Sequence, residues 1–275
     1  MTQFGENDPV GKSPGTAGAP PSTARFGGLA FGELSPLAMF VVFFAVAAVF
    51  LVFPHVYAGI LHRTADSGAY FDIGSVSGLI CYAVSVGFCL FWVRGSSRRG
   101  QSLRLAEETG RYSWFHGWEW FPVLIACEAI VAVYGASNPA RLGEASEASF
   151  FQALASPFAS ITWLILAVNL VVLAPVLYQL IFWGIGLAGY RNTGSADRAT
   201  FWCAALSVLM FRSTLFYGIP TNSFLADFLF GGYILSAYVR LRSGSLSSSI
   251  AANCLNNTIV LAIAAYLYKT YGLLI

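Results

Sequence analysis

Charge is scarce in this sequence: only 10% of its 275 residues are Asp, Glu, Lys or Arg, whereas 57% are apolar. A soluble domain carries about a quarter charged residues, so this composition excludes a water-soluble fold of the same size. A lipid bilayer removes the need for a charged surface, because lipid-facing side chains should be apolar. The net charge of +2 is too small to indicate a nucleic-acid partner. The composition therefore predicts an integral membrane protein whose surroundings are the lipid bilayer.

Histidine and paired cysteines are also missing where chemistry would need them. No histidine follows His116, and the sequence contains no Ser-His-Asp order, no glycine-rich phosphate loop and no HExxH. None of the five cysteines has CxxC spacing, so we expect neither a metal site nor a cofactor. All five lie in apolar stretches, where we expect small buried side chains: Cys81, Cys89, Cys127, Cys203 and Cys254.

Long apolar runs account for most of the chain after residue 30. Each is close to the roughly 20 residues that a bilayer crossing needs, and in lipid such runs must be helices, since a lone strand would leave backbone groups unpaired. The longest run contains Pro175, which favours a kink, so an eighth crossing stays open. The predicted fold is an all-α polytopic bundle of about seven spans. The runs lie at 36–60, 72–94, 118–136, 157–190, 199–217, 222–240 and 246–271.

The polar segments between the runs predict the domain organisation and the orientation. Residues 1–30, rich in Gly, Pro, Ser and Thr, are expected to be a disordered tail. Residues 31–156 hold the first helices and a basic interfacial loop near 94–118, and residues 157–275 form a second unit. Basic residues gather in alternate loops and in the tail, which predicts a cytoplasmic N-terminus.

Three ionisable residues lie inside predicted spans, where charge is costly and is a functional hypothesis by default. Arg212 and Asp227 lie at similar distances from the turn between two successive runs, so we expect an Arg212–Asp227 ion pair facing the interior. A structural clamp is the favoured role, with a substrate contact as the alternative. Glu128 has no evident partner. Several amides also lie in spans, and interhelical hydrogen bonding explains them most simply: Asn169, Gln179, Asn253, Asn256 and Asn257.

Three short motifs in the second unit resemble those of the CAAX-protease and bacteriocin-processing (CPBP) family of intramembrane endopeptidases. In the first, Ala174-Pro175 precedes Tyr178 and Gln179, which stand where the family has paired glutamates, and Trp183, which stands in place of its arginine. In the second, a Phe precedes by four residues a position that is histidine in the family and Leu215 here.

The third motif is a histidine followed four residues later by asparagine. Here Asn253 replaces the histidine, and Asn257 is retained. The resemblance spans about residues 160 to 275 and implies a CAAX-protease-like core at 157–275. It also implies a bacterial inner membrane as the setting.

The resemblance implies that family members activate a water with glutamate and histidine. Gln179 cannot act as a base, Tyr178 is a poor base near neutral pH, and the side chain of Leu215 cannot form a hydrogen bond. Only Asn257, a plausible oxyanion donor, survives. Because each lost acid or base group removes about 10²–10⁴-fold of rate, we expect a pseudoprotease that binds, stabilises or assembles a membrane partner.

This hypothesis places the partner in a groove lined by residues of the three motifs and of the predicted ion pair. The residues expected there are Tyr178, Gln179, Trp183, Arg212, Asp227, Asn253 and Asn257. Two further hypotheses stay open. One is an active intramembrane endopeptidase with a relocated site at Glu128 or Glu119, and the second is a transporter or channel that uses Arg212 and Asp227 as a polar path.

Overall fold

A computed structural model gives the fold of most of the predicted helical regions. It describes residues 25–26, 29–30, 32–60, 75–97, 115–136, 159–193, 196–212 and 224–271. Within these ranges the side chains of 25–26, 29–30, 127–128, 131–136, 159–160, 193, 196, 208, 210–212, 224–230, 264 and 267–271 are not described.

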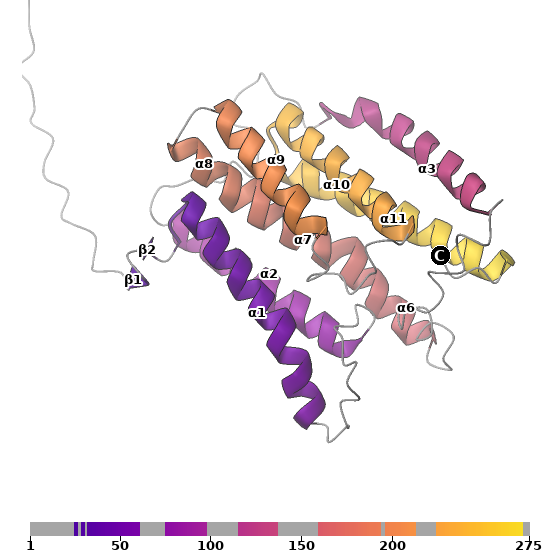
Figure 1. Cartoon of the computed structure of the whole chain (residues 1–275), viewed down its shortest axis with the longest axis horizontal. Coiled ribbons are helices and arrows are strands. Elements are labelled where there is room, and N and C mark those ends of the chain that lie inside the picture. The colour runs from indigo at the N-terminus through magenta and orange to yellow at the C-terminus, as the bar shows by residue number, and fades with distance from the viewer. Residues whose placement is uncertain are drawn as a thin grey trace, which may run out of the picture.

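The described chain is almost entirely helical (Figure 1). A two-residue antiparallel pair, β1 (Arg25–Phe26) with β2 (Leu29–Ala30), precedes the helices. The pair lies inside the segment at residues 1–30 that is predicted to be a disordered tail. The helices are α1 (Pro36–Ile60), α2 (Val76–Ser97), η1 (Trp118–Trp120), α3 (Phe121–Ala136), α6 (Ala159–Ala167), η3 (Val168–Leu173), α7 (Ala174–Tyr178), η4 (Gln179–Gly186), α8 (Leu187–Thr193), α9 (Ala196–Arg212), α10 (Phe224–Ser243) and α11 (Leu246–Tyr271).

Each predicted apolar run coincides with a helix, and α1 and α11 match their predicted bounds at both ends. Within the described residues, four helices are long and apolar enough to cross a membrane: Pro36–Ile60, Val76–Ser97, Ile161–Asn192 and Leu246–Ile263. Large apolar side chains on the outside of the bundle, such as Phe44 and Leu164 at 64% and 66% exposure, suit contact with lipid rather than water. The chain is therefore a helical membrane protein.

The run predicted at 157–190 forms one continuous helix, from α6 to α8, which we call the long helix. It contains two π-helical stretches, η3 and η4, with Pro175 between them in α7. In Figure 1 it crosses the middle of the bundle, with α1 and α2 on one side and α9, α10 and α11 on the other. The helix α3 lies at the edge, against α10.

Serine and glycine set the helix ends as their intrinsic preferences predict. Ser35, Ser75 and Ser245 accept hydrogen bonds from the backbone N–H groups of Ala38, Gly78 and Ser248 at 3.2, 3.0 and 3.2 Å. A serine oxygen in this position satisfies a donor that has no partner within its own helix. Gly244, with a φ of 71°, ends α10, because the left-handed conformation that follows many helices suits glycine. A two-residue turn therefore joins α10 to α11 as a helical hairpin.

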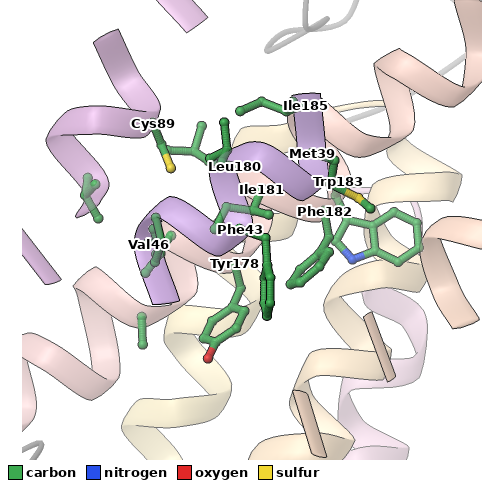
Figure 2. Close-up of a cluster of buried hydrophobic side chains, with 14 of the residues drawn as sticks. Met39, Phe43, Val46, Cys89, Tyr178, Leu180, Ile181, Phe182, Trp183 and Ile185 are labelled. Carbon is green, nitrogen blue, oxygen red and sulfur yellow. The ribbon is translucent and has the colours of Figure 1, made fainter. Parts of the chain in front are cut away.

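The main apolar core lies between α1, α2 and the long helix. Figure 2 shows Met39, Phe43 and Val46 of α1 beside Tyr178, Phe182 and Ile185. The rings of Phe43 and Phe182 lie 6.1 Å apart. This core fixes one face of the long helix and leaves the opposite face to the α10–α11 hairpin.

Three of the four cysteines whose side chains are described confirm the expectation of buried side chains. Cys81, Cys89 and Cys203 are buried, Cys254 is half-buried, and all four are free thiols. The side chain of Cys127 lies outside the described residues.

The α10–α11 hairpin depends on one glycine, which gives a first prediction. A Cβ added at Gly232 would overlap the side chain of Asn256, whereas a Cβ at Gly231 would meet only Leu124 Cδ1 at 3.4 Å. Gly232→Ala should therefore lower the free energy of unfolding by about 1–3 kcal/mol through overpacking. Gly231→Ala is the matched control and should be neutral or slightly stabilising, because alanine favours helix. Unfolding in mild detergent measures both, and equal effects would contradict this packing.

Candidate functional site

The first and third motifs meet in space where α11 packs against the long helix. Ser249 Oγ donates to Gln179 Oε1 at 2.5 Å. Two turns further along α11, Asn257 Nδ2 donates to the carbonyl of Leu170 at 2.7 Å. The structure therefore brings together residues that lie about 70 to 90 positions apart in the sequence. Leu215 of the second motif lies outside the described residues.

Gln179 is fully buried, and both ends of its amide are bonded. Its Nε2 donates to Ser236 Oγ of α10 at 2.7 Å, while its Oε1 accepts from Ser249 Oγ of α11. Ser236 uses its own hydrogen on the Tyr233 carbonyl at 2.7 Å, so its oxygen must accept from Gln179. The single Ser249 hydrogen is shared between Gln179 Oε1 and the Ser236 carbonyl, which lies 2.6 Å from Ser249 Oγ. Gln179 thus joins the long helix to both helices of the hairpin.

Trp183 and Tyr178 belong to the same buried layer, with 1% and 0% of their surfaces exposed. Trp183 Nε1 donates to the Tyr233 hydroxyl at 3.0 Å. The ring of Tyr178 stacks on Phe182 and meets Tyr233 edge-on, with centroids 6.1 and 6.4 Å apart. Figure 2 shows Tyr178 among the core rings of the long helix. Tyr178 is therefore a core aromatic residue, at a position where the CPBP resemblance would lead one to expect a glutamate.

Asn257 has a specific backbone role. In a π-helix each N–H reaches back five residues, as the N–H of Ala174 does to the Asn169 carbonyl. In the same five-residue register, the N–H of residue 175 would bond the carbonyl of Leu170. Pro175 has no N–H to give, and the Asn257 amide donates to the Leu170 carbonyl instead. Asn257 thus supplies the hydrogen bond that Pro175 cannot.

Arg240 has the corresponding role at the other π stretch. The N–H of Leu187 bonds two carbonyls, that of Gly184 and that of Phe182 five residues back. In the α-helical register of α8, the N–H of residue 188 would bond the carbonyl of Gly184, four residues back. The change of register therefore assigns no backbone donor to the Trp183 carbonyl. Arg240 Nε donates to this carbonyl at 3.3 Å, and Arg240 NH1 donates to the carbonyl of Gly244. Although it is an arginine, Arg240 is only 4% exposed.

The sequence patterns did not indicate several of these residues. They gave no site role to Tyr233, Ser236, Arg240 or Ser249. The run of serines at 243–249 was a usable signal, because hydroxyls inside an apolar span usually bond another helix or their own backbone. The pairing of Arg240 with a carbonyl on the long helix had no such local signal.

The remaining predicted residues are placed in part. Asn253 is buried, one turn from Asn257 on the same helix. Asn169 and Asn256 are also buried. The side chains of Arg212, Asp227 and Glu128 lie outside the described residues, so the expected ion pair stays a prediction.

The arrangement favours helix packing over proton transfer. The side chains that meet here are amides, hydroxyls, aromatic rings and one guanidinium, none of which is a good base near neutral pH. Where side chains are described, no group of three or more His, Cys, Asp or Glu could hold a metal ion. The chain has no match among known protein families, curated proteins or solved structures.

The relation between Pro175 and Asn257 predicts an energetic coupling. Asn257→Ala should lower the free energy of unfolding by about 1–3 kcal/mol, because it leaves the buried Leu170 carbonyl without a donor. In a Pro175→Ala background the loss should be smaller by about 1 kcal/mol, since alanine at this position has an N–H that can serve Leu170. A double-mutant cycle of unfolding in detergent measures the difference. Asn253→Ala, one turn away, is the control and should be additive with Pro175→Ala. Additivity of Asn257→Ala would contradict the assignment.

The bonding of Gln179 predicts a stability that depends on pH in one variant. In Gln179→Glu, an ionised carboxylate cannot donate to Ser236, and its oxygen would face the lone pairs of Ser236 Oγ. The free energy of unfolding should therefore be lower than that of wild type by about 1–3 kcal/mol at pH 8. Protonation restores an O–H donor, so the deficit relative to wild type should shrink towards pH 5. Gln179→Met removes both bonds and cannot titrate, so its deficit should be the same at both pH values. A Gln179→Glu deficit that grows from pH 8 to pH 5 would contradict the bonding assigned to position 179.

Proposed function

We propose that this chain is a pseudoprotease: an integral membrane protein on a scaffold similar to that of CPBP endopeptidases, which binds, stabilises or assembles a membrane partner without cleaving it. The observation that carries the proposal is the state of Gln179. This residue stands where the family has a glutamate, yet its amide is a buried donor and acceptor between three helices.

The bonding explains why glutamine suits this position better than glutamate. The Ser236 hydroxyl oxygen is placed to accept a hydrogen bond from residue 179, and the Ser249 hydroxyl is placed to donate one to it. An amide has both functions, whereas an ionised carboxylate only accepts. The retained Asn257 supports the same conclusion, because its amide is used on the Leu170 carbonyl rather than held ready for an oxyanion. Residues that the resemblance links to catalysis thus have packing roles in this chain.

The distribution of arginines supports the topology that belongs to this proposal, seven crossings with a cytoplasmic N-terminus. Among described side chains, every arginine lies at a helix end that the alternation of loops places on the cytoplasmic side. These arginines are Arg94, Arg191, Arg198, Arg240 and Arg242. Two hydrogen bonds join helix ends on this side: Asn192, at the end of the long helix, donates to the Leu34 carbonyl before α1, and Trp92, near the end of α2, donates to the Glu33 carbonyl. A bacterial inner membrane is the setting we propose.

A relocated protease site and a polar transport path gain little from the geometry. Glu119, a candidate acid of the relocated site, is exposed and accepts from the Gly117 N–H at 2.7 Å. Glu128, the second candidate acid, has a side chain outside the described residues. The same holds for Arg212 and Asp227, on which the transport path depends.

The proposal is tested by comparing membrane proteomes of cells with and without this protein. In the deletion, we expect at least one membrane protein to fall in abundance and no protein terminus to appear or disappear. The partner should co-purify with the chain in mild detergent. Both wild type and Gln179→Met, expressed at matched levels, should restore its abundance, because an assembly role needs the fold and not the amide.

Two outcomes would contradict the proposal. A cleavage product that vanishes in the deletion and returns with wild type, but not with Gln179→Met at equal protein level, would show a protease. A deletion that changes neither abundance nor termini of any membrane protein would exclude an assembly role.

A further inference from the structure

The turn before α3 is the strongest candidate outside the site already described. Residues Phe115–Gly117 lead into η1, and the Trp118 N–H closes the turn on the Phe115 carbonyl at 3.2 Å. Gly117 has a φ of 96°, which favours glycine. A Cβ at Gly117 would lie 2.8 Å from Val239 Cα, so the turn sits directly on the last part of α10. We call Phe115–Trp120 the aromatic turn.

Side-chain bonds hold the aromatic turn to the hairpin. Trp118 Nε1 donates to Ser248 Oγ, in the first turn of α11, at 2.9 Å. The ring of Trp118 packs on Phe121, with centroids 5.6 Å apart, against a cluster that includes Leu235 and Val239. Of the three aromatic residues in the turn, Trp118 is thus the one that points inward and fixes its position.

The other two rings of the turn point outward. Phe115 is 72% exposed and Trp120 is 52% exposed. Such large apolar surface is unfavourable in water, and the turn is tied down by Trp118, so these rings cannot bury themselves by a small movement.

The level of the turn along the bundle points to lipid as the surface that these rings meet. The turn contacts the end of α10 and Ser248, and the apolar span of α11 begins at Leu246. A crossing that begins at Leu246 would put the turn where hydrocarbon gives way to headgroups, and Trp is enriched there because its ring is apolar and its N–H is polar.

Charge beside the turn favours an anionic headgroup. Arg242, in the last turn of α10, is exposed, and its Cβ would be 3.4 Å from a Cβ at Gly117. The Arg242 guanidinium is also near enough to attract the Glu119 carboxylate. The Glu119 carboxylate accepts a hydrogen bond from the Gly117 N–H, so the arginine is not its only partner.

We propose that the aromatic turn and Arg242 form a contact for anionic phospholipid, with Phe115 and Trp120 inserted at the headgroup level and Arg242 on the phosphate. This role does not depend on whether the chain assembles a partner or cleaves one. A membrane anchor at this place would set the height of α3 relative to α10 and α11.

The test uses fluorescence of the full chain in phosphatidylcholine vesicles that contain a fixed fraction of brominated lipid. The difference between wild type and Trp120→Phe isolates the Trp120 signal. We expect bromine near the headgroup end of the acyl chain to quench this signal more than bromine near the chain terminus. Absence of quenching by either lipid would place Trp120 against water or a protein partner and overturn the proposal.

A second experiment tests the role of charge. It compares quenching of the Trp120 signal by brominated phosphatidylglycerol and by brominated phosphatidylcholine at the same fraction. The anionic lipid should occupy the site about fivefold more, the factor that one basic residue near an anionic surface contributes. Arg242→Gln should remove this preference. Arg94→Gln, an exposed arginine at the end of α2, is the control and should leave it unchanged. Equal quenching by the two lipids, or equal loss in both variants, would overturn the headgroup assignment.

Discussion

The rest of the structure depends on one constraint: backbone carbonyls in the middle of a membrane helix need donors. Pro175 withdraws one donor from the centre of the long helix, and the end of η4 passes over another carbonyl. Water is not at hand in hydrocarbon, so protein groups must replace the lost bonds. Asn257 and Arg240 do so from α11 and α10. Side-chain hydrogen bonds to backbone carbonyls therefore hold the hairpin to the long helix, in addition to apolar contact.

The same constraint underlies our proposal that this chain is a scaffold rather than a hydrolytic enzyme. An active site needs polar groups whose bonding is left open for substrate and water. Here Gln179 bonds Ser236 and Ser249, and Asn257 bonds the carbonyl of Leu170. A buried polar layer in which such groups have partners is rigid and specifies one helix packing. Such a layer fits the proposed scaffold role.

Sequence patterns located the helices well and the site only in part. Each predicted apolar run overlaps a helix in the part of the chain that the structure describes, and serine and glycine marked several helix ends. The motif resemblance placed Tyr178, Gln179, Asn253 and Asn257 in one region, and the structure brings the two segments that carry them into contact. The partners of Gln179 were not predicted, because Ser236 and Ser249 are ordinary polar positions until two helices are laid against a third.

Composition and run length are enough to predict a helical, membrane-embedded protein, because both depend only on transfer of side chains from water to lipid. The absence of acids and imidazoles at the motif positions can also be read directly from the residues. The contacts that the residues at those positions make depend on the packed structure. The register of a π-helix, the carbonyl left by Pro175 and the approach of Asn256 to Gly232 depend on how three helices pack, and packing geometry is not a local property of any segment.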